Sequence, residues 1–459
     1  MIQFMKRRAL AVGAVGTIVI VVIALALLGA GGIVAWEYSN SDHFCANACH
    51  SVHPEETLAH NTSFHGQVHC VECHIGRIPT LQAIALKPEH VKELWGVIFG
   101  YERPLVSTTL KPARQNCEGC HNPTVVHNDT IVVRKHYDTD PKSSESTTRL
   151  ILHTGVGTIR DKPDEFKGIH WHIASEVSFI ANDPQRREIP WVQVKRPDGK
   201  VVTYVDATAK TPAGGFKAEN ARRIECFDCH NSVGHPFPNP ADEVDEAIAT
   251  GRIDRTLTSA RKRAGELVAA GEKISGPYDE RSKTFDKMIA DSAAKTAVKP
   301  EQKEAEAKFE KTMKEILLAG TFEAKDVTWQ SFPHHTGHKD FPGCFRCHDG
   351  KHFDEQNNAI RLQCTLCHDL PAVTREKGKG SVPSTIVAGV SPPESHAAPN
   401  WMREHYQSLD ASCAACHGKT EYGQEGGGFC SNPACHGRTW PALDLNAEPK
   451  ATPKAAPKG

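Results

Sequence analysis

The stretch FCANACHSVH, residues 44–53, stands directly beyond the one long apolar run of the chain. Cys45 and Cys49 precede His50, with three residues between the two cysteines. The same order, a cysteine pair followed at once by histidine, recurs until all 16 cysteines of the 459 residues are used. Six motifs have two residues between the cysteines, and the last has four. Numbered 1 to 8 in chain order, the pairs are Cys45 and Cys49, Cys70 and Cys73, Cys117 and Cys120, Cys226 and Cys229, Cys344 and Cys347, Cys364 and Cys367, Cys413 and Cys416, and Cys430 and Cys435.

C-x-x-C-H is typical of covalent c-type haem attachment, in which two thioether bonds hold the porphyrin and the histidine reaches the iron. Structural zinc has no need of a histidine after every second cysteine, and disulfides need only an even count. The sequence therefore predicts eight covalently bound c-type haems. Their first iron ligands would be His50, His74, His121, His230, His348, His368, His417 and His436.

The amino terminus predicts a membrane anchor. Residues 9–36 contain no charged side chain, and a helix needs about 20 residues to cross a bilayer. Lys6, Arg7 and Arg8 precede this run, which keeps residues 1–8 in the cytoplasm by the positive-inside rule. The alternative is a cleaved signal peptide, whose apolar core is only about 7 to 15 residues. We expect a single-pass protein of a bacterial inner (cytoplasmic) membrane, with its haem domain in the periplasm.

Composition adds two constraints. The formal charge is −1 and the pI about 7.1, so nucleic acid is not indicated as a partner. Eight haems shared by one chain of this length leave little protein per porphyrin. We therefore expect a multihaem cytochrome c fold, mainly α-helical and irregular around a haem core, with a small β-hairpin insert.

Motif spacing and periodicity predict the domain organisation. "GIHWHIA" at 168–174 alternates as a strand does, with His170 and His172 on one face, and "WVQVKRPDGKVVTYV" at 191–205 predicts a hairpin. Apolar residues at helical spacing follow in 241–320, among them Phe309, Met313, Ile316 and Leu317. The expected parts are 37–240 with haems 1–4 (insert about 132–221), 241–330 helical, 331–371 with haems 5–6, 372–445 with haems 7–8 after a linker at about 377–399, and a disordered tail at 446–459.

Histidine is the expected second ligand for most irons. The chain has five methionines, and none lies near a motif in the first 240 residues. Bis-histidine ligation is therefore expected, which gives low potentials compared with His/Met ligation. The alternative for each histidine is an ordinary surface or capping residue, and for His60 and His127 the two readings stay open. The candidate distal ligands are His53, His65, His136, His170, His172, His235, His338, His352, His396 and His405.

The anchor, the first motif, "VHCVECHIG" at 68–76 and "KPEHVKELWGVIFG" at 87–100 together resemble the NapC/NirT/NrfH family of membrane-anchored quinol dehydrogenases. "CFDCHNSVGH" at 226–235 also fits, because the family places a distal histidine where His235 stands. The resemblance covers residues 1 to about 131 and 222–240. The later motifs are similar to larger inner-membrane cytochromes of extracellular electron transfer. In the NrfH branch a methionine binds the first iron, whereas "HSVHPEE" at 50–56 has none.

The segment at 87–100 is the predicted quinol site. Pro88 suits the first position of a helix and Gly100 the position past its end, and the apolar face between them suits a membrane interface or a protein contact equally. The resemblance favours the membrane and implies Lys87, His90 and Glu93 as groups that bind quinol or accept its protons. For each of them a solvated helix face is the alternative.

Three functions compete at this stage. The chain oxidises menaquinol or ubiquinol from the membrane pool and passes electrons to periplasmic c-type cytochromes or a periplasmic reductase, while membrane lipid surrounds its anchor. Alternatively it is an electron conduit within a larger respiratory complex. The third class, a reductase of a small nitrogen or sulfur compound, often replaces one motif histidine by lysine, and all eight motifs here keep histidine.

Overall fold

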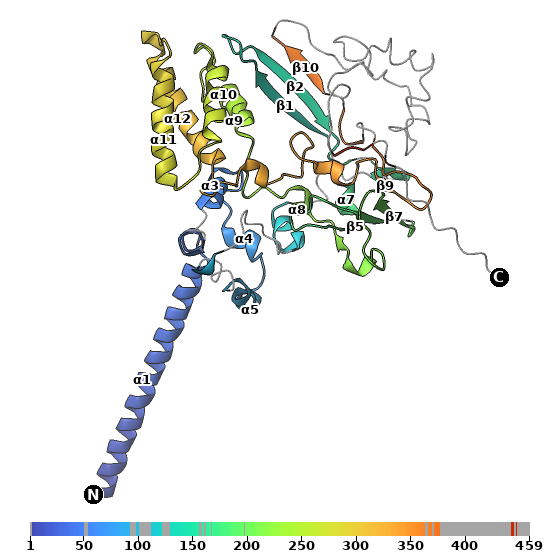
Figure 1. Ribbon diagram of the computed structural model, residues 1–459. Coiled ribbons are helices and arrows are strands. Elements are labelled where there is room, and N and C mark those ends of the chain that lie inside the picture. The colour runs from blue at the N-terminus through green and yellow to red at the C-terminus, as the bar shows by residue number, and fades with distance from the viewer. Residues whose placement is uncertain are drawn as a thin grey trace, which may run out of the picture. The chain divides into compact units, whose positions relative to one another are not determined.

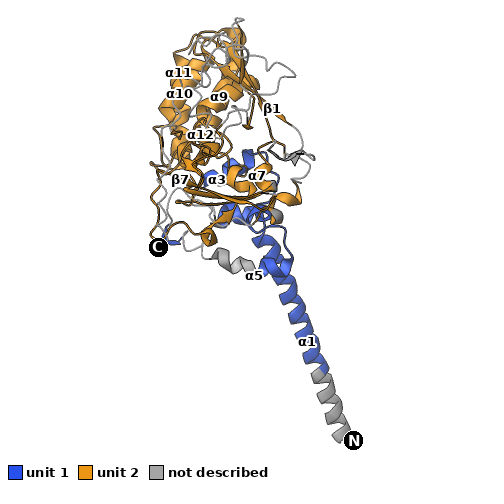
Figure 2. Cartoon of the chain, turned by 90° about the vertical axis from the view of Figure 1, so that its right-hand side faces the viewer, with its two compact units in different colours: residues 1–101 blue, residues 102–459 orange. Residues whose placement is uncertain are grey.

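The computed structural model describes residues 2–49, 54–91, 98–100, 112–121, 129–155, 158–159, 162–166, 168–196, 198–362, 366–369, 371–376, 442–444 and 447. The chain divides into two compact units, residues 1–101 and 102–459 (Figure 2). Each unit is described by itself. Motifs 7 and 8, the linker at 377–399 and the tail from 448 onward lie outside the described residues.

The first unit is helical. Its longest element, α1, runs from Ile2–Ser39 and contains the predicted anchor (Figure 1). From Val15–Ser39 this helix is long and apolar enough to cross a membrane, and its most apolar window is not buried inside the protein. A helix satisfies its own backbone hydrogen bonds, which is what a segment in lipid requires. The other helices are α2 (Asp42–Phe44), η1 (Cys45–Cys49), α3 (Pro54–Thr62), α4 (Cys70–His74) and α5 (Thr80–Val91).

The expected start of a helix at Pro88 is wrong. Helix α5 begins at Thr80, and the carbonyl of Pro79 accepts hydrogen bonds from the amides of Gln82 and Ala83 in its first turn. Good helix formers between Leu81 and Leu86 start the helix early, and Pro88 then falls near its end. The other boundary is confirmed: residues 98 and 99 are helical, and Gly100 has φ +92°, the left-handed conformation that glycine tolerates after a helix.

The second unit contains more sheet than a single hairpin. Strands β5 (Glu176–Ile180), β6 (Trp191–Lys195), β7 (Val201–Asp206), β8 (Arg222–Arg223) and β9 (His352–Phe353) form one antiparallel sheet in the order β8-β5-β6-β7-β9. The predicted hairpin is confirmed as β6 and β7, with Trp191 opposite Val205 and Lys195 opposite Val201. Strands β1 (Thr130–Tyr137), β2 (Glu145–Leu152) and β10 (Ala372–Arg375) form a second sheet, and β3 (Thr158–Ile159) pairs with β4 (Lys162–Phe166). Both larger sheets recruit a strand from beyond residue 350, so they are not confined to the insert.

The strand predicted at 168–174 is wrong as well. The segment turns at Gly168 and continues as helix α7 (Trp171–Ala174), with amide-to-carbonyl bonds from Trp171 to Gly168 and from Ile173 to His170. Trp171 is buried with Val177, Phe179 and their neighbours, so one large side chain, not an alternating face, anchors the segment. Residues two apart on a helix point to different sides, and His170 and His172 therefore diverge.

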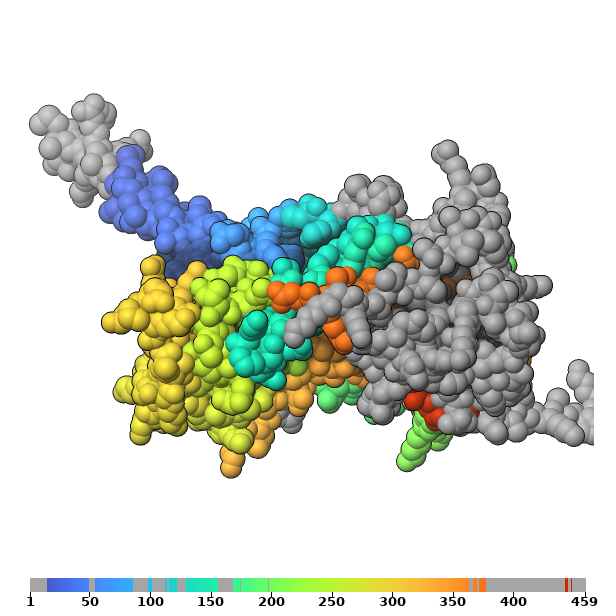
Figure 3. Space-filling view, turned by 90° about the horizontal axis from the view of Figure 1, so that it is seen from above, coloured from blue at the N-terminus to red at the C-terminus, as the bar shows by residue number. Residues whose placement is uncertain are grey.

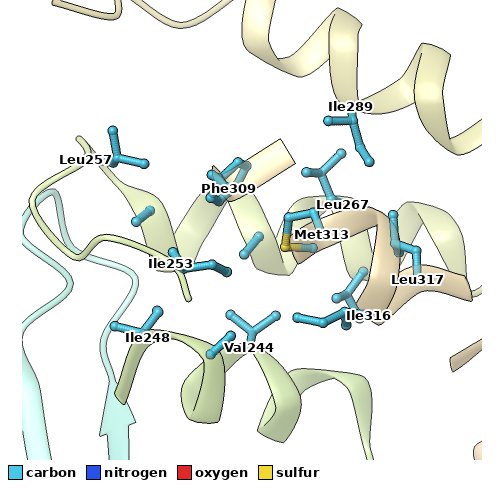
Figure 4. Packing of buried hydrophobic residues seen from close by; sticks show 14 of the residues in the cluster. Val244, Ile248, Ile253, Leu257, Leu267, Ile289, Phe309, Met313, Ile316 and Leu317 are labelled. Carbon is cyan, nitrogen blue, oxygen red and sulfur yellow. The ribbon is translucent and has the colours of Figure 1, made fainter. Parts of the chain in front are cut away.

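The predicted helical segment is confirmed as four helices that lie side by side (Figure 1): α9 (Pro240–Ala249), α10 (Ala260–Gly271), α11 (Tyr278–Ala294) and α12 (Lys303–Gly320). Phe309, Met313, Ile316 and Leu317 are at most 4% exposed and fill the centre of the bundle (Figure 4). Helix α9 also packs against β1, so the bundle and the β1–β2 ribbon share a continuous surface (Figure 3).

The remaining short elements surround the cysteine motifs and the loops between them. They are η3 (Ala113–Gln115), η4 (Cys117–Gly119), η6 (Ala218–Asn220), α8 (Cys226–Cys229), η7 (Pro300–Gln302), η8 (Trp329–Ser331) and η9 (Gly343–Arg346).

One buried ion pair joins α10 and α12. The guanidinium of Arg263 donates to both carboxylate oxygens of Glu306, with 3.0 Å between Nη1 and Oε2, and it lies 4.5 Å from the ring centroid of Phe309. Removing one member of a buried pair leaves the other charge uncompensated. Glu306→Ala should therefore lower the free energy of unfolding of the bundle by about 3–5 kcal/mol.

Pulse proteolysis in urea, with cleavage mapped to residues 240–320, measures this change. Glu304→Ala removes an exposed carboxylate from the same turn and serves as the matched control. Equal midpoints for Glu306→Ala and Glu304→Ala would contradict the prediction.

Candidate haem-binding site

Motif 1 takes an unusual backbone form. Residues Cys45–Cys49 make a π-helical turn that continues directly from α2. A π turn closes hydrogen bonds from i to i+5 and so takes in one residue more than an α turn. The extra residue between Cys45 and Cys49 is accommodated in this way, without a break between α2 and the π turn.

Asp42 ties motif 2 to the end of the anchor. Its carboxylate accepts the backbone amide of Cys70 at 2.9 Å and pairs with His69 Nδ1 at 2.9 Å. The thiols of Cys45 and Cys70 also hydrogen-bond, and this bond is the main reason that the pKa of Cys70 is raised. Motifs 1 and 2 are therefore neighbours within the first unit.

Motifs 3, 4 and 5 are contiguous in the second unit. The thiol of Cys226 in motif 4 hydrogen-bonds that of Cys117 in motif 3, which lowers the pKa of Cys226. Arg346, inside motif 5, donates from Nη2 to the carbonyl of Asp228, inside motif 4, at 2.8 Å.

Motif 6 is joined to the β1–β2 ribbon. His368 forms a β-bridge with Leu152, and the amide of His153 donates to the carbonyl of Cys367 at 2.8 Å.

The predicted haem-attaching cysteines differ in exposure. Cys73 of motif 2 and Cys120 of motif 3 are exposed, whereas both cysteines of motif 4 and both of motif 5 are half-buried. None of the described cysteines forms a disulfide, so these thiols stay available for attachment.

Haem attachment at all 16 cysteines stays a prediction from sequence. The backbone of Cys49 is described, but its side chain is not. The cysteines that lie wholly outside the described residues are Cys364 of motif 6, Cys413 and Cys416 of motif 7, and Cys430 and Cys435 of motif 8.

Three motif histidines each face a second histidine. The ring centroids are 6.2 Å apart for His230 and His170, 5.9 Å for His348 and His172, and 6.2 Å for His368 and His338. All three second histidines are predicted distal ligands. The pairing itself could not be read from sequence, because the partners lie 30 to more than 170 positions apart.

Hydrogen bonds orient four of these six rings. His170 Nδ1 lies 2.5 Å from the carbonyl oxygen of Thr154, and His172 Nδ1 lies 2.7 Å from the carbonyl oxygen of Ile169. The corresponding bonds run from His348 to Arg361 at 2.6 Å and from His368 to Asp369 at 2.5 Å. A carbonyl oxygen only accepts, so Nδ1 carries the proton and Nε2 presents its lone pair, which is the tautomer that ligates metals.

Burial favours the neutral form of four of the six rings, because it lowers their pKa. Desolvation lowers the pKa of His172 and His230, and it lowers that of His348 to about 4. It also lowers the pKa of His338. A neutral imidazole is the form that binds a metal, so the electrostatics agree with the hydrogen bonds.

The three pairs fit an iron between the rings. Two imidazole nitrogens that each bind a metal at about 2 Å hold their ring centroids about 6 Å apart. The residues present therefore fit c-type haem at motifs 4, 5 and 6.

Other candidate ligands are placed differently. His352 is buried, with Nδ1 2.8 Å from Asp349 Oδ1 and Nε2 2.6 Å from the carbonyl of Ile189, so neither nitrogen is open to a metal. His136 lies on β1, 3.3 Å from Asp245 Oδ2. His60 Nε2 lies 3.1 Å from the carbonyl of Val68.

All the histidine ligands, the paired ones included, stay predictions. His65 lies in the loop that follows α3, and His235 lies in the loop that follows α8. The candidates outside the described residues are His50, His53, His127, His396, His405, His417 and His436.

The predicted quinol site is described only in part. Lys87 and His90 lie on the backbone of α5, and Glu93 lies outside the described residues.

Sequence reasoning missed the residues that join the motifs. Asp42, Asp228 and Arg346 carry the contacts given above, yet each looked like a spacer. For Asp228 and Arg346 a signal existed, since both are charged residues enclosed between haem-attaching cysteines.

Comparisons with known proteins show the family of the chain. The model of the NapC/NirT cytochrome c family, N-terminal region, matches residues 5–104. The cytochrome c-type protein ImcH of Geobacter sulfurreducens is 33% identical over 355 residues, which cover 76% of this chain and 68% of that protein. No solved structure matches. The chain therefore belongs to the NapC/NirT family of membrane multihaem c-type cytochromes.

Proposed function

We propose that this protein oxidises menaquinol or ubiquinol at the periplasmic face of the inner membrane and passes the electrons through eight haems to periplasmic carriers. The observation that carries the proposal is the direct run of the chain from the apolar helix α1, through α2, into the π turn of motif 1. A haem-attachment motif is thereby held at the membrane, where quinol arrives.

The protein's own residues supply attachment, ligation and order. Each cysteine pair would hold one haem, and the haems supply one-electron transfer. The histidine pairs His170/His230, His172/His348 and His338/His368 would ligate the irons at motifs 4, 5 and 6. Because His170 and His172 diverge from one short helix, a single segment would fix two neighbouring haems at once.

Adjacent motifs support stepwise electron transfer. Motifs 1 and 2 touch through Cys45 and Cys70, and motifs 3, 4 and 5 touch through Cys117, Cys226, Asp228 and Arg346. Haems held by such neighbours would lie close together, which is what a chain of electron carriers needs.

Lys87, His90 and Glu93 are proposed as the groups that bind quinol and accept its two protons. With the purified, detergent-solubilised protein, a menaquinol analogue should reduce the haems rapidly, as followed at the haem α band. Lys87→Ala or Glu93→Ala should slow this reduction at least tenfold. The loss of one acid–base group typically slows a reaction about 10²–10⁴-fold.

Lys92→Ala is the matched control for a general loss of charge on the same segment. Unchanged rates in both site variants would remove these residues from the quinol site. No reduction by quinol, with full reduction by dithionite, would instead favour a conduit fed by another protein.

Peptide mapping by mass spectrometry tests the haem count. All eight cysteine-pair peptides should carry a haem adduct, including the two with irregular spacing, which end at Cys49 and Cys435. The double variant Cys45→Ser/Cys49→Ser should lose one haem per chain and keep the other seven. A wild-type peptide from motif 1 or motif 8 without the adduct would reduce the count accordingly.

The ligand pairs make a spectroscopic prediction. His172→Ala should convert one low-spin haem to high spin in the electron paramagnetic resonance spectrum, because His348 would then be the one remaining imidazole on that iron. Haem content should not change, since Cys344 and Cys347 are intact. His334→Ala, which removes a half-buried histidine that faces no motif histidine among the described residues, should leave the spectrum unaltered. A fully low-spin His172→Ala protein would contradict the pairing.

A further inference from the structure

Motifs 4 and 5 are joined by a cluster of three arginines and one aspartate, of which all but Arg222 are buried. Asp228 stands between the cysteines of motif 4 and is 1% exposed, and Arg346 stands between those of motif 5 and is 8% exposed. Arg186, 9% exposed, and Arg222 complete the set, which we call the arginine cluster.

Asp228 serves two of the arginines. Its Oδ2 accepts Arg222 Nη2 at 3.0 Å, and its Oδ1 lies 3.3 Å from Arg186 Nε. Both guanidinium groups also lie over the ring of Phe227, at 5.7 Å for Arg186 and 5.1 Å for Arg222. Two cations thus share one carboxylate and one aromatic face.

Arg346 has no carboxylate within ion-pair distance in the described part of the chain. Its three hydrogen bonds run to backbone carbonyls, from Nε to Gly343 at 2.9 Å, from Nη1 to Arg186 at 3.0 Å and from Nη2 to Asp228 at 2.8 Å. Carbonyl dipoles orient a guanidinium but do not cancel its charge. These four residues carry three positive charges and one negative charge, and the carboxylate of Asp183 also acts electrostatically on Arg186.

The backbone is strained to build this arrangement. Arg186 has φ +57°, a left-handed conformation that a residue with a side chain adopts only at a cost of about 1–3 kcal/mol. That conformation places its carbonyl on Arg346 while its side chain reaches Asp228. Strain and uncompensated buried charge together indicate a purpose other than stability, because each opposes folding.

We propose that the arginine cluster raises the reduction potentials of the haems attached at motifs 4 and 5, so that electrons collect there. This inference rests on the proposed function, which puts a haem on each motif. Reduction of each iron from iron(III) to iron(II) would take one electron, supplied by quinol under the proposed function, and would lower the local charge by one. Nearby positive charge stabilises the reduced form, and low-dielectric surroundings strengthen the effect.

The size of the effect can be stated in advance. A unit charge within about 10 Å, at an effective dielectric constant of about 20, changes a one-electron equilibrium constant roughly tenfold. A tenfold change in a one-electron couple corresponds to about 59 mV. Since two of the eight haems are involved, about a quarter of the α-band amplitude should move.

The test is a spectroelectrochemical redox titration of the intact haem-loaded protein. In Arg346→Gln, about a quarter of the α-band amplitude should titrate at a lower potential. The expected shift is about 59 mV, which corresponds to a tenfold change in the equilibrium constant. Arg346→Lys keeps the charge but loses the forked hydrogen bonds of the guanidinium. Its change in reduction potential should be only a small fraction of the change in Arg346→Gln. Asp228→Asn removes the one negative charge and should move the same amplitude to higher potential.

Arg187→Gln is the matched control, since it removes an exposed guanidinium next to Arg186. Should Arg346→Gln fail to mature, the half-exposed Arg222→Gln gives the same direction of shift. Equal shifts for Arg346→Gln and Arg346→Lys, or a downward shift for Asp228→Asn, would overturn the inference, because a purely structural role has no dependence on the sign of charge.

Mass spectrometry of the peptides around 226–229 and 344–347 separates this result from the proposed function. Missing haem on those peptides would contradict the proposed function itself. Haem present with an unmoved titration in Arg346→Gln, Arg222→Gln and Asp228→Asn would overturn only the electrostatic inference.

Discussion

Three pairs of imidazole rings, with centroids about 6 Å apart, are the constraint on which the proposed haem site depends, and backbone hydrogen bonds orient four of the six rings. In each pair one ring belongs to a cysteine motif and the other to a distant segment, as in His172 and His348. The five-stranded sheet connects these segments. Strands β5, β6 and β7 follow α7 in the chain, and β9, which pairs with β7, follows motif 5 directly. The sheet thus brings the segments that carry His172 and His348 together, while the helical bundle has an apolar core of its own.

The motifs themselves were predictable from sequence, and so were the α1 helix, the β6–β7 hairpin and the apolar face of α12. These features rest on local signals: residue order at the cysteines, a long uncharged run, a Pro-Asp-Gly turn, and helical spacing of Phe309 and Met313. The segment at 168–174 shows where local signals fail. Its alternation imitated a strand, whereas burial of Trp171 and a turn at Gly168 made a helix. As a result His170 lies near His230 of motif 4, and His172 lies near His348 of motif 5.

The pairing of the histidines and the contacts within the arginine cluster were beyond sequence reasoning for a physical reason. Both consist of contacts between residues far apart in the chain, and no periodicity encodes which histidine faces which. Asp228 and Arg346 illustrate this well, since each is an ordinary spacer until the other is placed beside it. The quinol site remains a matter of sequence and family likeness, as the side chains of Lys87, His90 and Glu93 lie outside what the structure describes.

An experimental structure of the haem-loaded protein, with iron located by anomalous scattering, tests the central claim most directly. The account predicts one iron between His170 and His230, one between His172 and His348, and one between His338 and His368, each with a porphyrin bonded to the adjacent cysteine pair. Irons at motifs 4 to 6 that are bound on their second face by other residues, or by none, would contradict it.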